Sequence, residues 1–178
     1  MSNFAKKIKL PHRSCSTGQA LPEAIVALGL ITVGLIAVLA FLNHSSSSVS
    51  RAIDRNIASN LAEEGLSIVK SAVAYEKAKS NFNQSFSSNR FAVDYHNGLG
   101  EAPKDWSKVS ANQFGTPLHF DDSNNLYGYS GNFETKFYRV IDIDANANFI
   151  KANSIVKWQP QGGGSPETVN LETYFYNY

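Results

Sequence analysis

The chain has 178 residues, with 16 basic and 15 acidic side chains, and charged residues make up only 17% of it. This length predicts one folded domain plus an anchoring segment. Cys15 is the single cysteine, which excludes an intrachain disulfide. The first 18 residues hold four basic and no acidic side chains, so the rest of the chain has 12 basic against 15 acidic, a net charge of −3. An acidic chain gives no electrostatic case for a nucleic-acid partner.

One apolar stretch, Ala24–Leu42, contains no charged residue. As a helix it would span roughly 28 Å, which is close to the thickness of the hydrocarbon core of a bilayer. A lone carboxylate, Glu23, stands directly before it. A charge at the edge of a membrane span is costly unless it is paired, so the position of Glu23 predicts a partner for it.

A basic leader ending in Gly18, a carboxylate on the fifth residue after it, and a long apolar helix together resemble the family of type IV pilins and type II secretion pseudopilins. The run Asn56–Val69, which contains Ala62–Leu66, and the final strands with Trp158 at a strand end resemble the minor subunits of that family. The resemblance implies that prepilin peptidase cuts between Gly18 and Gln19, that Gln19 is N-methylated, and that Glu23 serves filament assembly. Gln19 departs from the phenylalanine that the family most often has there, which bears on methylation more than on cleavage.

The implied partners are prepilin peptidase, other pilin or pseudopilin subunits, an inner-membrane assembly platform, and membrane lipid before assembly. The positive charges lie on the leader side of the span, which predicts a cytoplasmic N-terminus and a single pass through the inner membrane, with the C-terminal domain outside. After assembly the chain would belong to a pilus or pseudopilus. The function implied is that of a structural filament subunit.

Two other interpretations of the N-terminal region remain open. In the first, Glu23 only flanks a signal-anchor, and the chain is a single-pass membrane-anchored extracytoplasmic binding protein that does not polymerise. In the second, Val38-Leu39-Ala40 is the cleavage site of a secretory signal peptide. The apolar stretch is longer than the 7–15 residues usual in signal peptides, which disfavours the second.

One helix is predicted from Pro22 to about Lys79, because proline suits a first turn and the later apolar residues recur at helical spacing. That spacing is set by Ile53, Ile57, Leu61, Ile68 and Ala72. The polar segment Asn43–Ser50 marks either the point where the helix leaves lipid or a short break. This second half is amphipathic and should pack on a domain.

Beyond the helix the apolar period approaches two, which is typical of strands. The segments Phe91–Tyr95, Leu118–Phe120 and Leu126–Tyr129 are short strand candidates, the last two forming a hairpin. The stronger strands are Lys136–Ile143, Ile150–Trp158 and Thr168–Tyr176. The predicted fold class is therefore α+β, a long N-terminal helix packed on a C-terminal antiparallel sheet. Its predicted parts are a leader (1–18), a membrane or filament-core half-helix (19–50), an amphipathic half-helix (51–80) and a β-domain (81–178).

Asp142, Asp144 and Asn146 alternate as calcium ligands do, but an EF-hand needs Gly at its sixth position and Glu at its twelfth. This chain has Ala147 and Asn153 there, so a plain hairpin turn is favoured and no metal is predicted. The sequence shows no nucleophile elbow, phosphate loop or paired carboxylates, which predicts neither an enzyme nor a cofactor. The strands should expose several tyrosines, as the rim of a core or as a recognition surface: Tyr127, Tyr129, Tyr174, Tyr176 and Tyr178.

Overall fold

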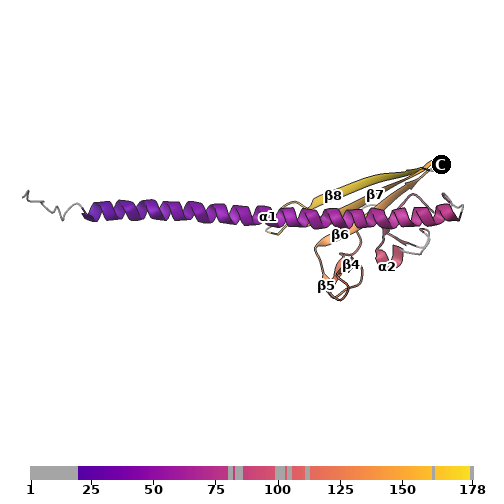
Figure 1. Cartoon of the computed structure of the whole chain (residues 1–178), viewed down its shortest axis with the longest axis horizontal. Coiled ribbons are helices and arrows are strands. Elements are labelled where there is room, and N and C mark those ends of the chain that lie inside the picture. The colour runs from indigo at the N-terminus through magenta and orange to yellow at the C-terminus, as the bar shows by residue number, and fades with distance from the viewer. Residues whose placement is uncertain are drawn as a thin grey trace, which may run out of the picture. The chain divides into compact units, whose positions relative to one another are not determined.

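The computed structural model describes residues 20–79, 82, 86–98, 103, 106–110, 113–161 and 163–176. Its contacts divide the chain into two compact units, Met1–Ser46 and Ser47–Tyr178. The boundary falls inside the polar segment Asn43–Ser50. The fold is α+β, with a long N-terminal helix and a C-terminal antiparallel sheet (Figure 1). The predicted fold class is confirmed.

Helix α1 (Ala20–Ala78) is 59 residues long and continues through Asn43–Ser50, so the alternative of a break there is wrong. Pro22 lies in its first turn, where the missing N–H of proline costs nothing. Within the unit Met1–Ser46 the apolar side chains of α1 are exposed; Leu30, for example, is 71% exposed. A helix that is apolar on all sides requires an apolar environment, either lipid or other protein.

The larger sheet has five antiparallel strands in the order β2-β1-β6-β7-β8. Their bounds are β1 (Asn89–Ala92), β2 (Ser107–Lys108), β6 (Phe137–Ala145), β7 (Phe149–Trp158) and β8 (Glu167–Tyr176). Strands β6, β7 and β8 form a meander of two hairpins, as the alternation in the sequence predicted. Strand β1 joins this meander beside β6 although it precedes β6 by more than 40 residues.

A smaller antiparallel sheet has the order β4-β3-β5, and a short helix, α2 (Tyr95–Gly98), follows β1. The strands of this sheet are β3 (His119–Asp121), β4 (Leu126–Gly128) and β5 (Phe133–Glu134). The predicted hairpin is confirmed: Asp121 accepts hydrogen bonds from the backbone N–H of Ser123 and from the Asn124 side chain, both at 2.9 Å. These bonds, with that of Ser123 first, lower the pKa of Asp121. The turn is thereby closed by its own residues.

The second half of α1 covers one face of the meander. The buried residues of β7 are every second one, from Ile150 to Trp158, because side chains alternate across a strand. They pack with α1 in two clusters, one around Val69 and Val73 and one around Leu61. Phe175 of β8 packs on the first cluster as well.

The helix lies closest to the sheet at Gly65. A Cβ added there would lie 2.4 Å from Ser154 Oγ and 3.4 Å from Arg139 Cδ, so the close approach requires glycine. Arg139 is fully buried beside it and donates hydrogen bonds to the carbonyl oxygens of Leu61 (3.1 Å) and Val93 (2.8 Å). Its Nη1 also lies 3.2 Å from Glu64 Oε1. Arg139 thus ties the sheet to the helix and to the segment after β1.

Some short elements differ from the prediction. The strand predicted at Phe91–Tyr95 ends at Ala92, and Tyr95 begins α2 instead. Strands β2 and β5, of two residues each, were not predicted because so few residues cannot show a period. Of the two strands that extend the larger sheet beyond β6, β1 was therefore predicted and β2 was not.

Candidate functional site

Two of the predicted site residues, Gly18 and Gln19, lie outside the described residues. Glu23 is described and lies exposed in the first turn of α1. A carboxylate there interacts favourably with the positive end of the helix dipole. The side chains around it are apolar: Pro22, Val26, Ala27 and Leu30 line, with Glu23, a hollow of about 700 Å³. Glu23 is thus a single acidic group among apolar side chains in the first turn of α1.

The helix behind Glu23 could cross a membrane. It is long and apolar enough, and none of its most apolar window is buried by the described residues. Thr32 is one of its few polar side chains, and its hydroxyl donates to the Gly29 carbonyl oxygen at 2.8 Å. This bond satisfies the hydroxyl within the helix, as an apolar surrounding requires.

The three calcium candidates lie around the β6–β7 hairpin. Both carboxylate oxygens of Asp142 accept from Arg90, at 2.6 Å from Nε and 2.7 Å from Nη2. The bond to Asp142 raises the pKa of Arg90. A cation at Asp142 would therefore have to displace a bidentate guanidinium.

The other two candidates also have roles in the hairpin. Asp144 accepts from the Ser88 hydroxyl at 3.2 Å, and the Asn146 backbone N–H donates to the Phe149 carbonyl oxygen at 2.9 Å. No group of three or more His, Cys, Asp or Glu that could hold a metal occurs among the described residues. These contacts account for all three residues as parts of a hairpin.

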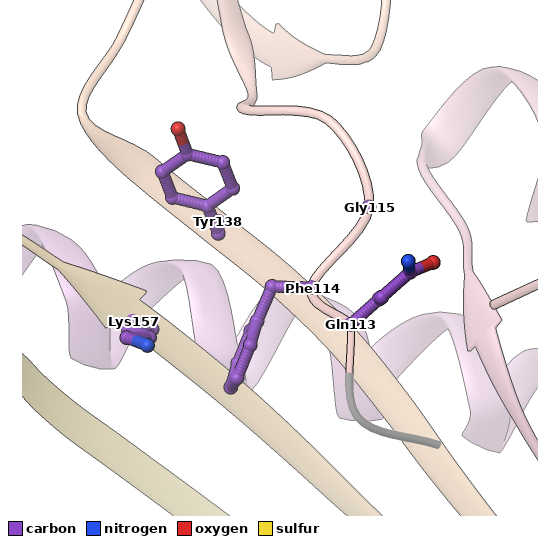
Figure 2. Close-up of a pocket in the computed structure, with 5 residues that line it drawn as sticks. All are labelled: Gln113, Phe114, Gly115, Tyr138 and Lys157. Atoms are coloured by element: carbon purple, nitrogen blue, oxygen red, sulfur yellow. The ribbon is translucent and has the colours of Figure 1, made fainter. Parts of the chain in front are cut away.

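A pocket of about 550 Å³ lies on the face of the larger sheet opposite α1 (Figure 2). Tyr138 of β6 and Lys157 of β7 are cross-strand partners on that face. The segment Gln113–Gly115 passes over them, and the Phe114 ring lies between Lys157 and Gln113 in Figure 2. Gly115 has φ +70°, a conformation that favours glycine and lets the chain turn here.

Two cations contact the Phe114 ring. Lys157 Nζ is 5.1 Å from the ring centroid, and Arg90 Cζ is 5.7 Å from it. The Arg90 charge is already paired with Asp142, whereas Lys157 has no carboxylate within 4 Å among the described residues. The pocket therefore combines aromatic walls with one ammonium group. The pocket was not predicted, because no local pattern indicates that the segment Gln113–Gly115 lies over β6 and β7.

The predicted exposed tyrosines divide into two groups. Tyr174 and Tyr176 of β8 are 43% and 48% exposed, and their rings lie near that of Phe149. Tyr129, by contrast, is half-buried against the second cluster, and its hydroxyl donates to the Arg139 carbonyl oxygen at 2.8 Å, so it lies at the rim of the core rather than on an open surface. Burial raises its pKa to about 12. Tyr127 is half-buried against Phe120, and Tyr178 lies outside the described residues.

Comparison with known proteins adds no relative. The chain matched no protein-family model, no curated protein and no solved structure. The function must therefore be argued from the residues and their geometry.

Proposed function

We propose that the chain is a structural subunit of a type IV pilus or of a type II secretion pseudopilus. In this proposal it is made as a prepilin, cleaved after Gly18 by prepilin peptidase, and held in a filament by its N-terminal helix. The observation that carries the proposal is Glu23, the one carboxylate at the head of the uncharged first part of α1, Ala24–Leu42, whose apolar side chains are exposed in the single chain. Such a surface must be covered by lipid or by other subunits.

The proposal also accounts for topology. The basic residues precede the span, so the N-terminus would be cytoplasmic and the unit Ser47–Tyr178 would lie outside the inner membrane. Gly29 and Gly34 fit this view, because a Cβ added at either would meet nothing in the single chain. Small residues allow close contact between helices in an apolar environment.

Glu23 would act in assembly by pairing with the amino group of Gln19 on a neighbouring subunit. In lipid it can stay near the headgroups, where water satisfies it. In a filament core an unpaired charge would cost several kcal/mol, so the pair would favour one register between subunits.

Processing and assembly can be tested separately. In wild type, N-terminal sequencing should find Gln19 as the first mature residue, and Gly18→Asp should leave the precursor uncut. Glu23→Ala and Glu23→Gln should be cleaved normally but stay in the membrane fraction, because neither side chain neutralises an ammonium group. The measurement is the ratio of sheared filament to membrane-bound subunit, or co-purification with the major subunit if this chain is a minor one.

Three results would contradict the proposal. A mature N-terminus at Phe41 would indicate a secretory signal peptide instead. Equal incorporation of wild type and both Glu23 variants would make Glu23 a flanking acid only. Correct processing without any filament would favour a membrane-anchored binding protein that does not polymerise.

A further inference from the structure

The last strand, β8, forms one edge of the larger sheet (Figure 1). It is ten residues long and pairs with β7 along its whole length, and no strand lies beyond it in the described part of the chain. In an antiparallel ladder every second residue directs its backbone N–H and C=O away from the paired strand. The edge of β8 therefore offers a row of hydrogen-bonding groups at strand spacing, and the geometry that satisfies such a row is another strand.

A groove runs beside this edge, on the face of the sheet that packs on α1. Thr173 and Phe175 of β8 point to that face, because they are the cross-strand partners of the buried residues Ala152 and Ile150. Opposite them, residues at helical spacing on α1 complete a hollow of about 370 Å³: Glu63, Leu66, Ser67 and Lys70. A strand added to β8 would direct every second side chain into this groove.

Strand β8 runs in the same direction as the part of α1 beside it. Leu171 packs on the cluster that contains Leu61, and Phe175, further along β8, packs on the cluster that contains Val69, further along α1. A strand that pairs antiparallel with β8 would therefore run opposite to α1.

Two charges on α1 give the groove a polarity. Glu63 and Lys70 lie two helical turns apart, roughly 10 Å, with Leu66 between them. Both are exposed, and neither has an ion-pair partner within the residues that the structure describes. An antiparallel strand complements them with an acid facing Lys70, an apolar side chain over Leu66 and a base facing Glu63, in that order from its N-terminus.

A second copy of this chain does not supply that strand. In the proposed function, on which this step rests, all copies enter the membrane or filament in one direction, whereas antiparallel pairing of two β8 strands would point their α1 helices in opposite directions. Parallel pairing would turn one copy over and bring Glu172, from the polar side of its β8, into a groove that already holds Glu63. The other described edge strands, β2, β4 and β5, have only two or three residues each.

We propose that the edge of β8 and the groove beside it bind an extended segment of a different protein, which pairs antiparallel with β8 and adds a sixth strand to the larger sheet. The segment has an acidic, an apolar and a basic side chain at alternate positions, in that order from its N-terminus. In this mode of recognition the backbone hydrogen bonds give affinity, and the alternate side chains give specificity.

Peptide binding to the full-length chain in mild detergent tests the proposal. The probe is a fluorescent peptide of about nine residues, with valine at its centre, glutamate two positions before it, lysine two positions after it and threonine elsewhere. Fluorescence anisotropy should show saturable binding. A peptide with the glutamate and lysine exchanged should bind about tenfold more weakly, because each charge would then face a like charge.

Backbone methylation tests whether the peptide binds as a strand. One form of the probe has N-methyl groups on alternate residues beginning at the first, and the other has them on alternate residues beginning at the second. Only one of these two sets of N–H groups can face β8, so one form should lose binding by about tenfold or more while the other keeps it.

Variants of the chain test the groove. Glu63→Lys combined with Lys70→Glu should reverse the preference between the probe and its charge-exchanged form. Lys108→Glu is the matched control, since Lys108 is an exposed charge at the opposite edge of the same sheet, and it should leave the preference unchanged. Unchanged tryptophan fluorescence shows that each variant is folded.

Three results would overturn the inference. The first is no saturable binding of either peptide up to about 1 mM. The second is equal binding of the two methylated forms, or a preference that the groove variant does not reverse. The third is tighter binding of a peptide with this chain's own residues 167–176, which would make a second copy the occupant.

The peptide assay and the filament assay fail independently. Glu23→Ala should bind the probe as wild type does. If that variant also assembles as well as wild type, the filament proposal loses its support while the β8 site stands. If filaments require Glu23 but no peptide binds, the filament proposal stands and the inference fails.

Discussion

The close approach of α1 to the larger sheet makes Gly65→Ala a sharp test of the fold. In an exposed helix the substitution would stabilise by up to ~1 kcal/mol. Here the new methyl group would lie 2.4 Å from Ser154 Oγ and 3.3 Å from Ser154 Cβ. Overpacking of this kind costs about 1–3 kcal/mol, so we expect Gly65→Ala to lower the free energy of unfolding by about 1–2 kcal/mol.

A second substitution, Ser154→Ala, tests whether contact with the Ser154 hydroxyl causes the loss of stability. Ser154 Oγ is buried and has no hydrogen-bond partner among the described residues, so Ser154→Ala removes an unsatisfied hydroxyl and should itself be neutral or stabilising. With the oxygen gone, the next atoms are Ser154 Cβ at 3.3 Å and Arg139 Cδ at 3.4 Å, which small shifts can accommodate. The double variant should therefore recover the loss, with a coupling energy of about 1 kcal/mol or more.

The assay is denaturant unfolding of the purified chain in mild detergent, followed by tryptophan fluorescence. Trp106 and Trp158 are both buried in the Ser47–Tyr178 unit and report on its unfolding. Ser67→Ala, at an exposed position of the same helix, measures the gain from helix propensity alone. The reasoning is refuted if Gly65→Ala is as stable as wild type, or if the two substitutions are additive.

Three further predictions use the same unit. Arg139→Met should lower the free energy of unfolding by about 3–5 kcal/mol in the same assay, because it removes a buried cation from Glu64 and the hydrogen bonds that Arg139 donates to the Leu61 and Val93 carbonyl oxygens; a loss below about 1 kcal/mol would contradict this. Tyr129→Phe should cost about 1 kcal/mol at neutral pH through its lost hydrogen bond. The folded pKa of Tyr129, about 12, lies above the unfolded value of about 10, so the stability linked to its proton is full below pH 10 and is lost as the pH rises through 12. Unfolding curves at pH 9–11 should therefore fall less steeply with pH for Tyr129→Phe, and equal slopes would count against the buried hydroxyl. Finally, residues from about Ser50 onward should be soluble without the apolar half-helix, and their circular dichroism should show helix with antiparallel sheet rather than random coil.

The long elements could be predicted from the sequence because the residues of each one repeat with the period of its secondary structure. Helix α1 shows apolar residues at helical spacing, and β8 alternates over ten residues, so their bounds were predicted to within a few positions. Contacts between distant segments leave no such local trace. The pairing of Arg90 with Asp142 joins residues 52 positions apart, and it places β1 beside β6.

The residues of the candidate site were also predicted where a local pattern marks them and missed where only the fold brings them together. Glu23 was found because a charge stands out beside an apolar stretch. Lys157 did not stand out, since a lysine on a strand is ordinary until its neighbours are known. The role of Tyr129 stayed open for a related reason: its hydroxyl donates to the Arg139 carbonyl oxygen, which only the folded chain brings near.

The position of the meander at the end of the chain has a consequence for biosynthesis. The residues of α1 around Ala58–Val73 are synthesised first, but the meander that forms most of the sheet packed on them begins only at Phe137. Until β6, β7 and β8 emerge, the amphipathic half of α1 has no sheet to pack on, and closing so long a loop is slow. The apolar side of the helix therefore lacks this sheet until the last 40 or so residues have been synthesised. A chain interrupted before β8 would present that surface to any chaperone or protease it meets, so quality control can recognise incomplete copies before they join an assembly.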